Sequence, residues 1–159
     1  MIAGYGDGTF GPDNPVTRQQ FAKMVVVSLG LTIPPATASS FRDVEAMPEC
    51  SDPLYPIGYV EACAQAGITV GKTQYTFCPW DNITRAQLIT MVARATGLPS
   101  PPSGFVAPFE DFDSQHYPWA VRAYAAGLLD GLVDMGPDFD FWAPATRAEV
   151  CLLLSHLLD

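Results

Sequence analysis

The sequence predicts an all-α fold built from tandem copies of one helical unit. Three segments share a Thr-Arg pair, with the arginines at Arg18, Arg85 and Arg147. Each segment follows a proline-containing loop and carries apolar residues at the i, i+3, i+4 spacing of an amphipathic helix. Fifteen prolines and thirteen glycines indicate long, ordered loops between short elements, which leaves little room for β-strands.

Each Thr-Arg segment is expected to begin at a capped helix N-terminus. Threonine is a good N-cap, and a Gln or Glu three residues later completes a capping box. The pairs are Thr17 with Gln20, Thr84 with Gln87, and Thr146 with Glu149. We expect the first two helices to end at Gly30 and Gly97, because glycine readily takes the left-handed conformation that closes a helix.

A second unit precedes two of these helices. It opens with Phe-x-Asp at residues 41–43 and 109–111, and short helices are expected at roughly 54–66 and 117–126. The aspartates of the Phe-x-Asp motifs are expected to cap their loops. One module therefore comprises a Phe-x-Asp loop, a helix, a glycine-rich loop and a Thr-Arg helix.

This organisation predicts three tandem modules. The second half of module 1 occupies residues 1–31, module 2 residues 41–98 and module 3 residues 109–159. The intervening stretches, 32–40 and 99–108, are rich in proline and serine and are interpreted as linkers.

The first copy lacks the short helix that precedes the glycine loop in the other two. We therefore expect an upstream segment of a longer protein, or another chain, to complete module 1. Without that helix, apolar surface is expected to be exposed around Phe10, Phe21 and Val25.

Composition limits the class of protein. The chain has 159 residues, 48% of them apolar, so it can bury a sizeable core. Its net charge of −9, with only eight Lys and Arg, argues against nucleic acid as a partner. No apolar run approaches the ~18–20 residues of a membrane span, and the start lacks the pattern of a signal peptide. We expect no membrane insertion.

The stretch GYGDGTFGPDNPVTRQQF, residues 4–21, carries a recognisable pattern of a glycine-aspartate-glycine turn, Phe-x-Pro and Thr-Arg-Gln-Gln. With its two later copies, it resembles the S-layer homology (SLH) family, in which tandem modules anchor secreted proteins to the cell wall. The resemblance implies a pseudo-threefold bundle with grooves between modules, at the cell wall or surface of a bacterium. It further implies binding of secondary cell-wall polysaccharide, commonly through acidic sugars such as pyruvylated N-acetylmannosamine, with the Thr-Arg arginine contacting the acid.

The residues themselves agree with an anion site. An arginine in the first turn opposes the helix dipole, which favours acids there by roughly 0.3–1 kcal/mol. Free N–H groups at the terminus and the guanidinium fork would together hold a carboxylate, and aromatic side chains would stack on sugar rings. The predicted ligand-binding residues are Arg18, Arg85, Arg147, Tyr5, Asp7, Gly8, Thr17, Gln20, Thr84, Gln87, Trp119, Thr146 and Glu149.

Three alternatives stay open from sequence. The arginines can instead pair with Asp13, Asp81 or Asp140 and hold their loops. Asp7-Gly8 is first of all a turn signal. The whole chain can be a structural or assembly module of a surface layer or filament, whose grooves pack against protein rather than glycan.

No catalytic, metal or cofactor motif is present, so the sequence predicts a non-catalytic protein without a cofactor. His116 and His156 lack partners at useful spacing and are expected at the surface. One disulfide is expected within residues 50–78, with Cys78 pairing with Cys50 or Cys63.

Overall fold

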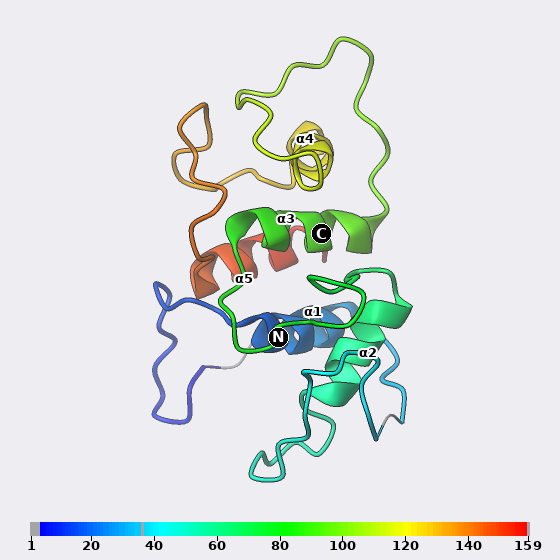
Figure 1. The fold of residues 1–159 in the computed structure, drawn as a ribbon. Helices are drawn as coiled ribbons and strands as arrows, with labels where there is room; N and C mark the ends of the chain where they lie inside the picture. Colours follow the sequence, from blue (N-terminus) through cyan, green and yellow to red (C-terminus); the bar gives the residue numbers. More distant parts are fainter. Residues whose placement is uncertain (1–3, 36, 159) are drawn as a thin grey trace.

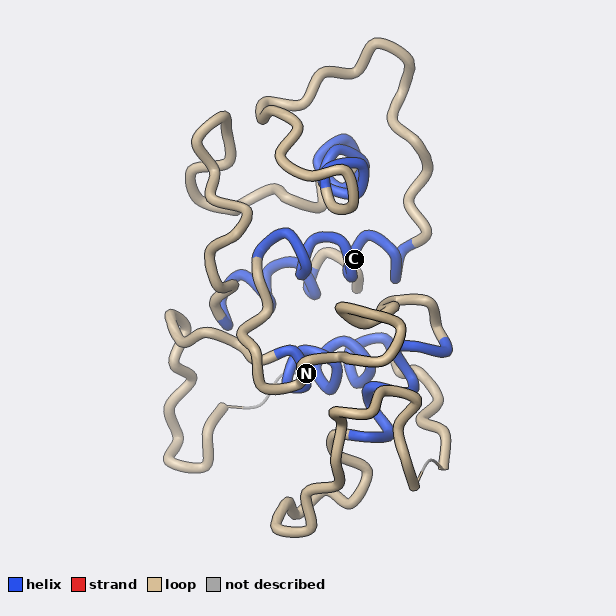
Figure 2. Tube along the Cα trace, in the orientation of Figure 1, coloured by secondary structure: helices blue, strands red, loops and turns tan. Residues whose placement is uncertain are grey.

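The computed structural model describes residues 4–35 and 37–158, and residues 1–3 of the first predicted module segment lie outside this part. The helices of the described residues are α1 (Arg18–Leu29), α2 (Ile57–Gln65), α3 (Arg85–Thr96), α4 (Tyr117–Ala125) and α5 (Arg147–Ser155). Long loops connect them, and in the described part no strands form (Figures 1 and 2). The predicted all-α class is confirmed. None of the described helices is long and apolar enough to cross a membrane.

The Thr-Arg helices α1, α3 and α5 begin as their sequences indicate. In each one the threonine hydroxyl accepts from the third helical N–H, and the third side chain accepts from the threonine N–H. All three capping boxes are therefore formed. Gly30 and Gly97 close α1 and α3 in the left-handed conformation, both with φ of 61°.

The loops before these helices join their N-termini in a ring. The first N–H of α1 donates to the loop before α3, that of α3 to the loop before α5, and that of α5 to the loop before α1. The bonds run from Arg18 to the Asp81 carbonyl (2.9 Å), from Arg85 to Ala143 (3.0 Å) and from Arg147 to Asn14 (2.9 Å). The next N–H of each helix donates to the same loop, at 2.8–3.1 Å. The bundle is therefore pseudo-threefold about α1, α3 and α5.

This ring corrects one expectation about the helix starts. The sequence predicts free N–H groups there as part of an anion site, but the first two donors of each helix bind loop carbonyls and the third binds its capping threonine. A helix end at an interface must satisfy its donors within the protein. Any anion recognition at these termini must therefore come from side chains.

The short helices cover Thr-Arg helices of the preceding copies. α2 packs on α1, and α4 packs on α3 (Figure 1). As a result Phe21 and Val25 in α1 are fully buried, at 0% exposed, so the expectation that they form an open apolar surface is wrong. Phe10 keeps 38% of its surface exposed. The reason is topological, because module 2 supplies the helix that shields α1.

The loops are held by buried side chains of their own. Phe77, in the loop before α3, is fully buried, and its ring centroid lies 5.7 Å from that of Phe41 in the Phe-x-Asp loop, with the rings tilted by 38°. Asp43 then accepts hydrogen bonds from the N–H groups of Phe77 (2.8 Å) and Cys78 (2.7 Å). Burying one such phenylalanine contributes about 1.5–3 kcal/mol. The loop that faces Arg18 is thus fixed in place.

The expected disulfide is not formed in the structure. All four cysteines are free thiols. Cys63 is fully buried in α2 and lies 3.7 Å from the Ala22 carbonyl oxygen, to which its thiol donates. Burial raises the pKa of Cys63 to about 12, which makes it an inert core thiol rather than a partner for Cys78.

Candidate functional site

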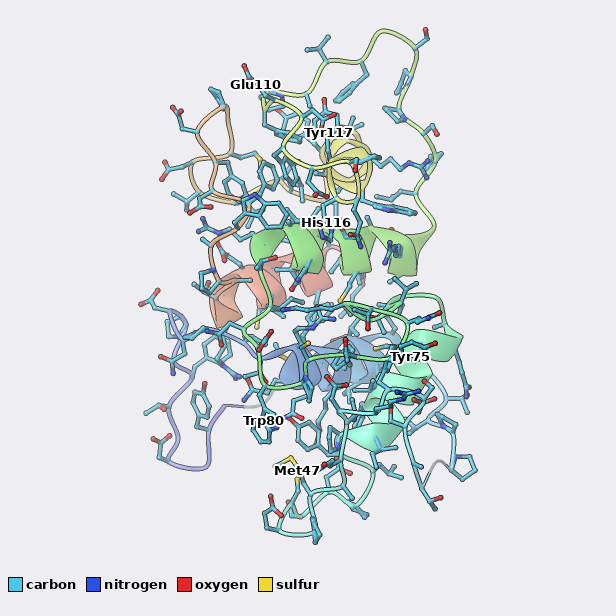
Figure 3. The ribbon with its side chains drawn as sticks, viewed as in Figure 1. Met47, Tyr75, Trp80, Glu110, His116 and Tyr117 are labelled. Atoms are coloured by element: carbon cyan, nitrogen blue, oxygen red, sulfur yellow. The ribbon has the colours of Figure 1, made fainter. Side chains whose placement is uncertain are left out.

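A cavity of about 210 Å³ opens between α3, the loop after α2 and the start of α4. We call it the Arg18 pocket; its lining consists of Arg18, Thr69, Gly71, Lys72, Gln87, Met91, Arg94, Gln115 and His116. Three of these side chains are Arg or Lys and none is acidic. Figure 3 shows His116 between α4 and α3. The pocket therefore favours an anion.

Arg18 is a buried residue of this pocket lining. It is 3% exposed, and its Nε donates to the Phe77 carbonyl at 2.7 Å while Nη1 donates to Gln87 Oε1 at 3.1 Å. Its guanidinium carbon lies 4.7 Å from the centroid of the Phe77 ring. Burial lowers the pKa of Arg18, yet an arginine stays protonated at physiological pH. Among the described residues, no carboxylate forms an ion pair with it.

Arg94 adds a second charge. It stands in the last turn of α3, about two turns from Gln87 on the same face. Its guanidinium carbon lies 5.4 Å from the Trp119 ring centroid, and burial lowers its pKa. Lys72, the third cation, binds Asp81 at 2.5 Å and is therefore compensated. The positive charge of the pocket comes mainly from Arg18 and Arg94.

The two histidines have partners that the sequence did not reveal. His116 is partly buried in the pocket wall, with Nδ1 2.8 Å from Thr90 Oγ1. Burial lowers the pKa of His116, which favours the neutral ring at pH 7. His156 Nδ1 lies 2.9 Å from the Leu128 carbonyl oxygen. The expectation that both are unpartnered surface residues is wrong.

The other two Thr-Arg arginines have different surroundings. Arg85 binds Glu149 through Nε at 2.8 Å and Nη2 at 2.7 Å, and Nη1 donates to the Asp140 carbonyl at 3.3 Å. Its acidic partner is thus the capping-box glutamate rather than one of the loop aspartates. Arg147 donates from Nε to the Phe10 carbonyl at 2.9 Å, with its guanidinium carbon 4.6 Å from the Tyr5 ring centroid. The lining of the Arg18 pocket includes Arg18 and Arg94 and no acidic residue, whereas Arg85 is paired with Glu149.

Several predicted ligand residues make contacts within the fold. Asp7 Oδ1 accepts from the N–H (2.9 Å) and hydroxyl (2.7 Å) of Thr9, and Gly8 has φ of 83°, so both build the turn. Trp119 lies 4.9 Å from the Arg122 guanidinium carbon as well as beside Arg94, so cations contact its ring. The six threonines, glutamines and glutamate of the capping boxes cap their helices, and Gln87 also lines the pocket.

The sequence did carry a signal for the missed pocket residues. Gln87, Met91 and Arg94 occupy positions i, i+4 and i+7, which share one face of a helix. The positions that correspond to Arg94 in the other two copies hold Val27 and His156. Only α3 therefore places an arginine two turns below its capping box.

Comparison with known proteins supports the resemblance. Residues 2–22 and 51–89 match the sequence profile of the S-layer homology domain. A surface layer protein of Brevibacillus choshinensis is 32% identical over 97 residues, which is 61% of this chain and 8% of that protein. A cellulosome-anchoring protein of Acetivibrio thermocellus is 27% identical over 129 residues, covering 81% of this chain and 28% of that protein.

The similarity extends into the third copy. An uncharacterised cell wall amidase of Bacillus anthracis is 31% identical over an alignment of 162 residues, which covers 98% of this chain and 28% of that protein. The chain spans less than a third of the length of each of these three relatives.

Proposed function

Because the chain carries S-layer homology domain sequence, we propose that it anchors a protein to the bacterial cell wall by binding an acidic sugar of the wall polysaccharide in the Arg18 pocket. The named relatives are surface-layer, cell-wall and anchoring proteins, which supports a cell-surface location. One of them is named as an amidase, so the chain we describe is proposed as the non-catalytic part of such proteins.

The observation that carries this proposal is a buried arginine in a cavity without acids. Arg18 is 3% exposed, its only described side-chain partners are neutral, and Arg94 lines the same space. A partly desolvated guanidinium binds a carboxylate more strongly than an exposed one, and its fork gives the contact direction. The cavity therefore supplies charge and geometry for one carboxylate.

The volume of the cavity limits the size of the ligand that it can bind. Its volume of about 210 Å³ is below the ~300–1,000 Å³ typical of pockets for larger ligands. One acidic sugar, rather than a long oligosaccharide, fits such a space. A pyruvylated sugar meets this requirement, because its carboxylate projects from the ring.

The test is co-sedimentation with purified cell-wall sacculi. Arg94→Gln removes a pocket charge while retaining much of the stem, and we expect about a tenfold loss of binding, the scale of one charge-assisted hydrogen bond. Arg122→Gln is the matched control, because Arg122 lies over the same Trp119 ring but outside the pocket lining. Equal binding by the two variants would refute the role of the pocket.

Arg18→Lys tests the geometry of the site. Lysine keeps the charge but loses the fork, so binding should weaken although the overall charge is unchanged. Arg18 variants should also weaken binding more than the same changes at Arg85, whose charge Glu149 already neutralises.

Sacculi from which acid has removed the polysaccharide should no longer bind the protein. Retained binding would favour a module that packs against protein.

A further inference from the structure

A second cavity, of about 420 Å³, lies beside the start of α1 and shares no residue with the Arg18 pocket. We call it the Trp80 cavity; its lining consists of Gln19, Asp43, Glu45, Ala46, Met47, Glu49, Pro79 and Trp80. Three of these residues are acidic, and none is Lys, Arg or His. Its charge is opposite to that of the Arg18 pocket. Figure 3 shows Trp80 and Met47 in the lower half of the view, away from Glu110 near its top.

The indole of Trp80 is presented by a fixed backbone. The side chain is 66% exposed, although large aromatic residues are usually mostly buried. The carbonyls on either side of it are held, since Pro79 accepts from the N–H of Gln19 at 3.1 Å and Asp81 accepts from the N–H of Arg18 at 2.9 Å. The exposed ring therefore projects from the ring of loops described above rather than from a free tip.

Gln19 supplies an amide that the fold does not use. The residue is 2% exposed, yet its side chain makes no hydrogen bond with any described residue. No side-chain nitrogen or oxygen of the described part is both fully buried and unpaired, so this amide reaches open space in the cavity that Gln19 lines. Alanine stands at the matching positions of α3 and α5, Ala86 and Ala148. The fold itself therefore does not require an amide here.

The carboxylates of this cavity differ in their partners. Asp43 is held by two backbone N–H donors, at 2.8 and 2.7 Å, which keeps its charge at the cavity wall. Glu45 and Glu49 form no ion pair with any described residue. No group of three His, Cys, Asp or Glu side chains in the described part is placed to hold a metal ion. An organic cation therefore suits this cavity better than a metal ion.

We propose that the Trp80 cavity binds a primary alkylammonium group, such as the side chain of a lysine-type residue on a peptide or polymer. The carboxylates supply the opposite charge, and the Gln19 carbonyl is a ready acceptor for an ammonium hydrogen. The Trp80 ring attracts a cation through its π face. Met47 and Ala46 give the methylene stem an apolar wall. This second recognition function uses different residues from the polysaccharide site.

The experiment titrates the ¹⁵N-labelled protein with Nα-acetyl-lysine amide at low ionic strength. We expect shifts in the Trp80 indole N–H and the Gln19 side-chain amide resonances. Nα,Nε-diacetyl-lysine amide is the matched probe, because acetylation removes only the ammonium charge. Equal shifts with both probes, or no shift at either resonance at tens of millimolar, would overturn the proposal.

Three variants separate the contributions. Gln19→Ala installs the residue of the sister helices, so it should fold normally and weaken binding about two- to fivefold. Glu45→Gln with Glu49→Gln should weaken it about five- to tenfold, the scale of two partly exposed ion pairs. Glu110→Gln removes a distant exposed acid and is the control. If the double variant bound as tightly as Glu110→Gln, the carboxylates would have no role.

Two further measurements test which ammonium ligand the cavity prefers and whether it binds independently of the Arg18 pocket. Glucosamine carries an ammonium group on a sugar ring and should bind more weakly, because it lacks a flexible stem to lie along Met47. Tighter binding of glucosamine would overturn the assignment to an alkylammonium group. Arg94→Gln should leave the lysine titration unchanged, so failure of the polysaccharide proposal would not affect this result.

Discussion

Replacing Glu149 with glutamine should open a second anion site at a small cost in stability. Glu149 is the acid that neutralises Arg85, with Nη2 at 2.7 Å. Glutamine occupies the same capping-box position in α1 and α3, and Gln87 there accepts both from Arg18 at 3.1 Å and from the Thr84 N–H at 3.3 Å. The variant can therefore keep the hydrogen bonds and lose only the charge.

The expected cost follows from these contacts. A charge-assisted hydrogen bond contributes about 1.5–3 kcal/mol and a neutral one about 0.5–1.5 kcal/mol, so their difference is about 1 kcal/mol. The first-turn acid adds about 0.3–1 kcal/mol through the helix dipole. The side chains of Arg85 and Glu149 are 25% and 14% exposed, so solvent screens part of this electrostatic stabilisation. We expect a loss of about 1–2 kcal/mol, or roughly 2–8 °C in Tm.

The assay combines thermal unfolding with sacculus binding. In an Arg94→Gln background, where the Arg18 pocket is weakened, adding Glu149→Gln should restore part of the binding, because Arg85 is then free to meet an anion. Glu110→Gln in the same background is the control for the change in net charge. A Tm loss far above 8 °C would show that the carboxylate is structurally essential. If binding did not recover, the idea that pairing with Glu149 prevents Arg85 from binding an anion would be refuted.

Two predictions concern the contacts of single side chains, Asp43 and Cys63. Burial alone would raise the pKa of Asp43, but its two backbone N–H donors lower it below the ordinary value, so its stabilising effect is complete above about pH 4 and is lost as the pH falls through the lowered pKa. Asp43→Asn should therefore reduce the urea midpoint at pH 7 and less so at pH 3; an equal reduction at both would contradict this reasoning. Burial raises the pKa of Cys63 to about 12, so iodoacetamide at pH 8 should modify it only after denaturation, as peptide mass spectrometry would show. Rapid labelling of the native protein would disprove its burial.

Local features of the structure were predictable because they depend on residues close in the chain. The threonine caps, the closing Gly30 and Gly97, and the short helices near 57–65 and 117–125 all follow from patterns a few residues long. Capping and amphipathic spacing act within one or two helical turns. The sequence alone was therefore sufficient to predict the helices and their caps.

The pairing of those elements was not predictable in the same way. Arg18 meets Gln87, and Arg85 meets Glu149, across 69 and 64 residues of chain. Such contacts depend on how the copies are arranged around the axis, and nothing local indicates that α2 would cover α1. The three arginines look alike in sequence, yet one faces a neutral amide and another a carboxylate. Their different partners follow from the ring.

The ring of loop-to-helix hydrogen bonds has a consequence for how this protein can change. Each copy completes the backbone of another, so removing or exchanging one copy would leave donors and carbonyls unmatched in two others. The three copies are therefore not independent folding units. In a solenoid, by contrast, each repeat contacts only its neighbours, and the stability is close to a sum of local contributions. We expect the three copies to unfold together and to be inherited as one block, with variation confined to the side chains that face the cavities.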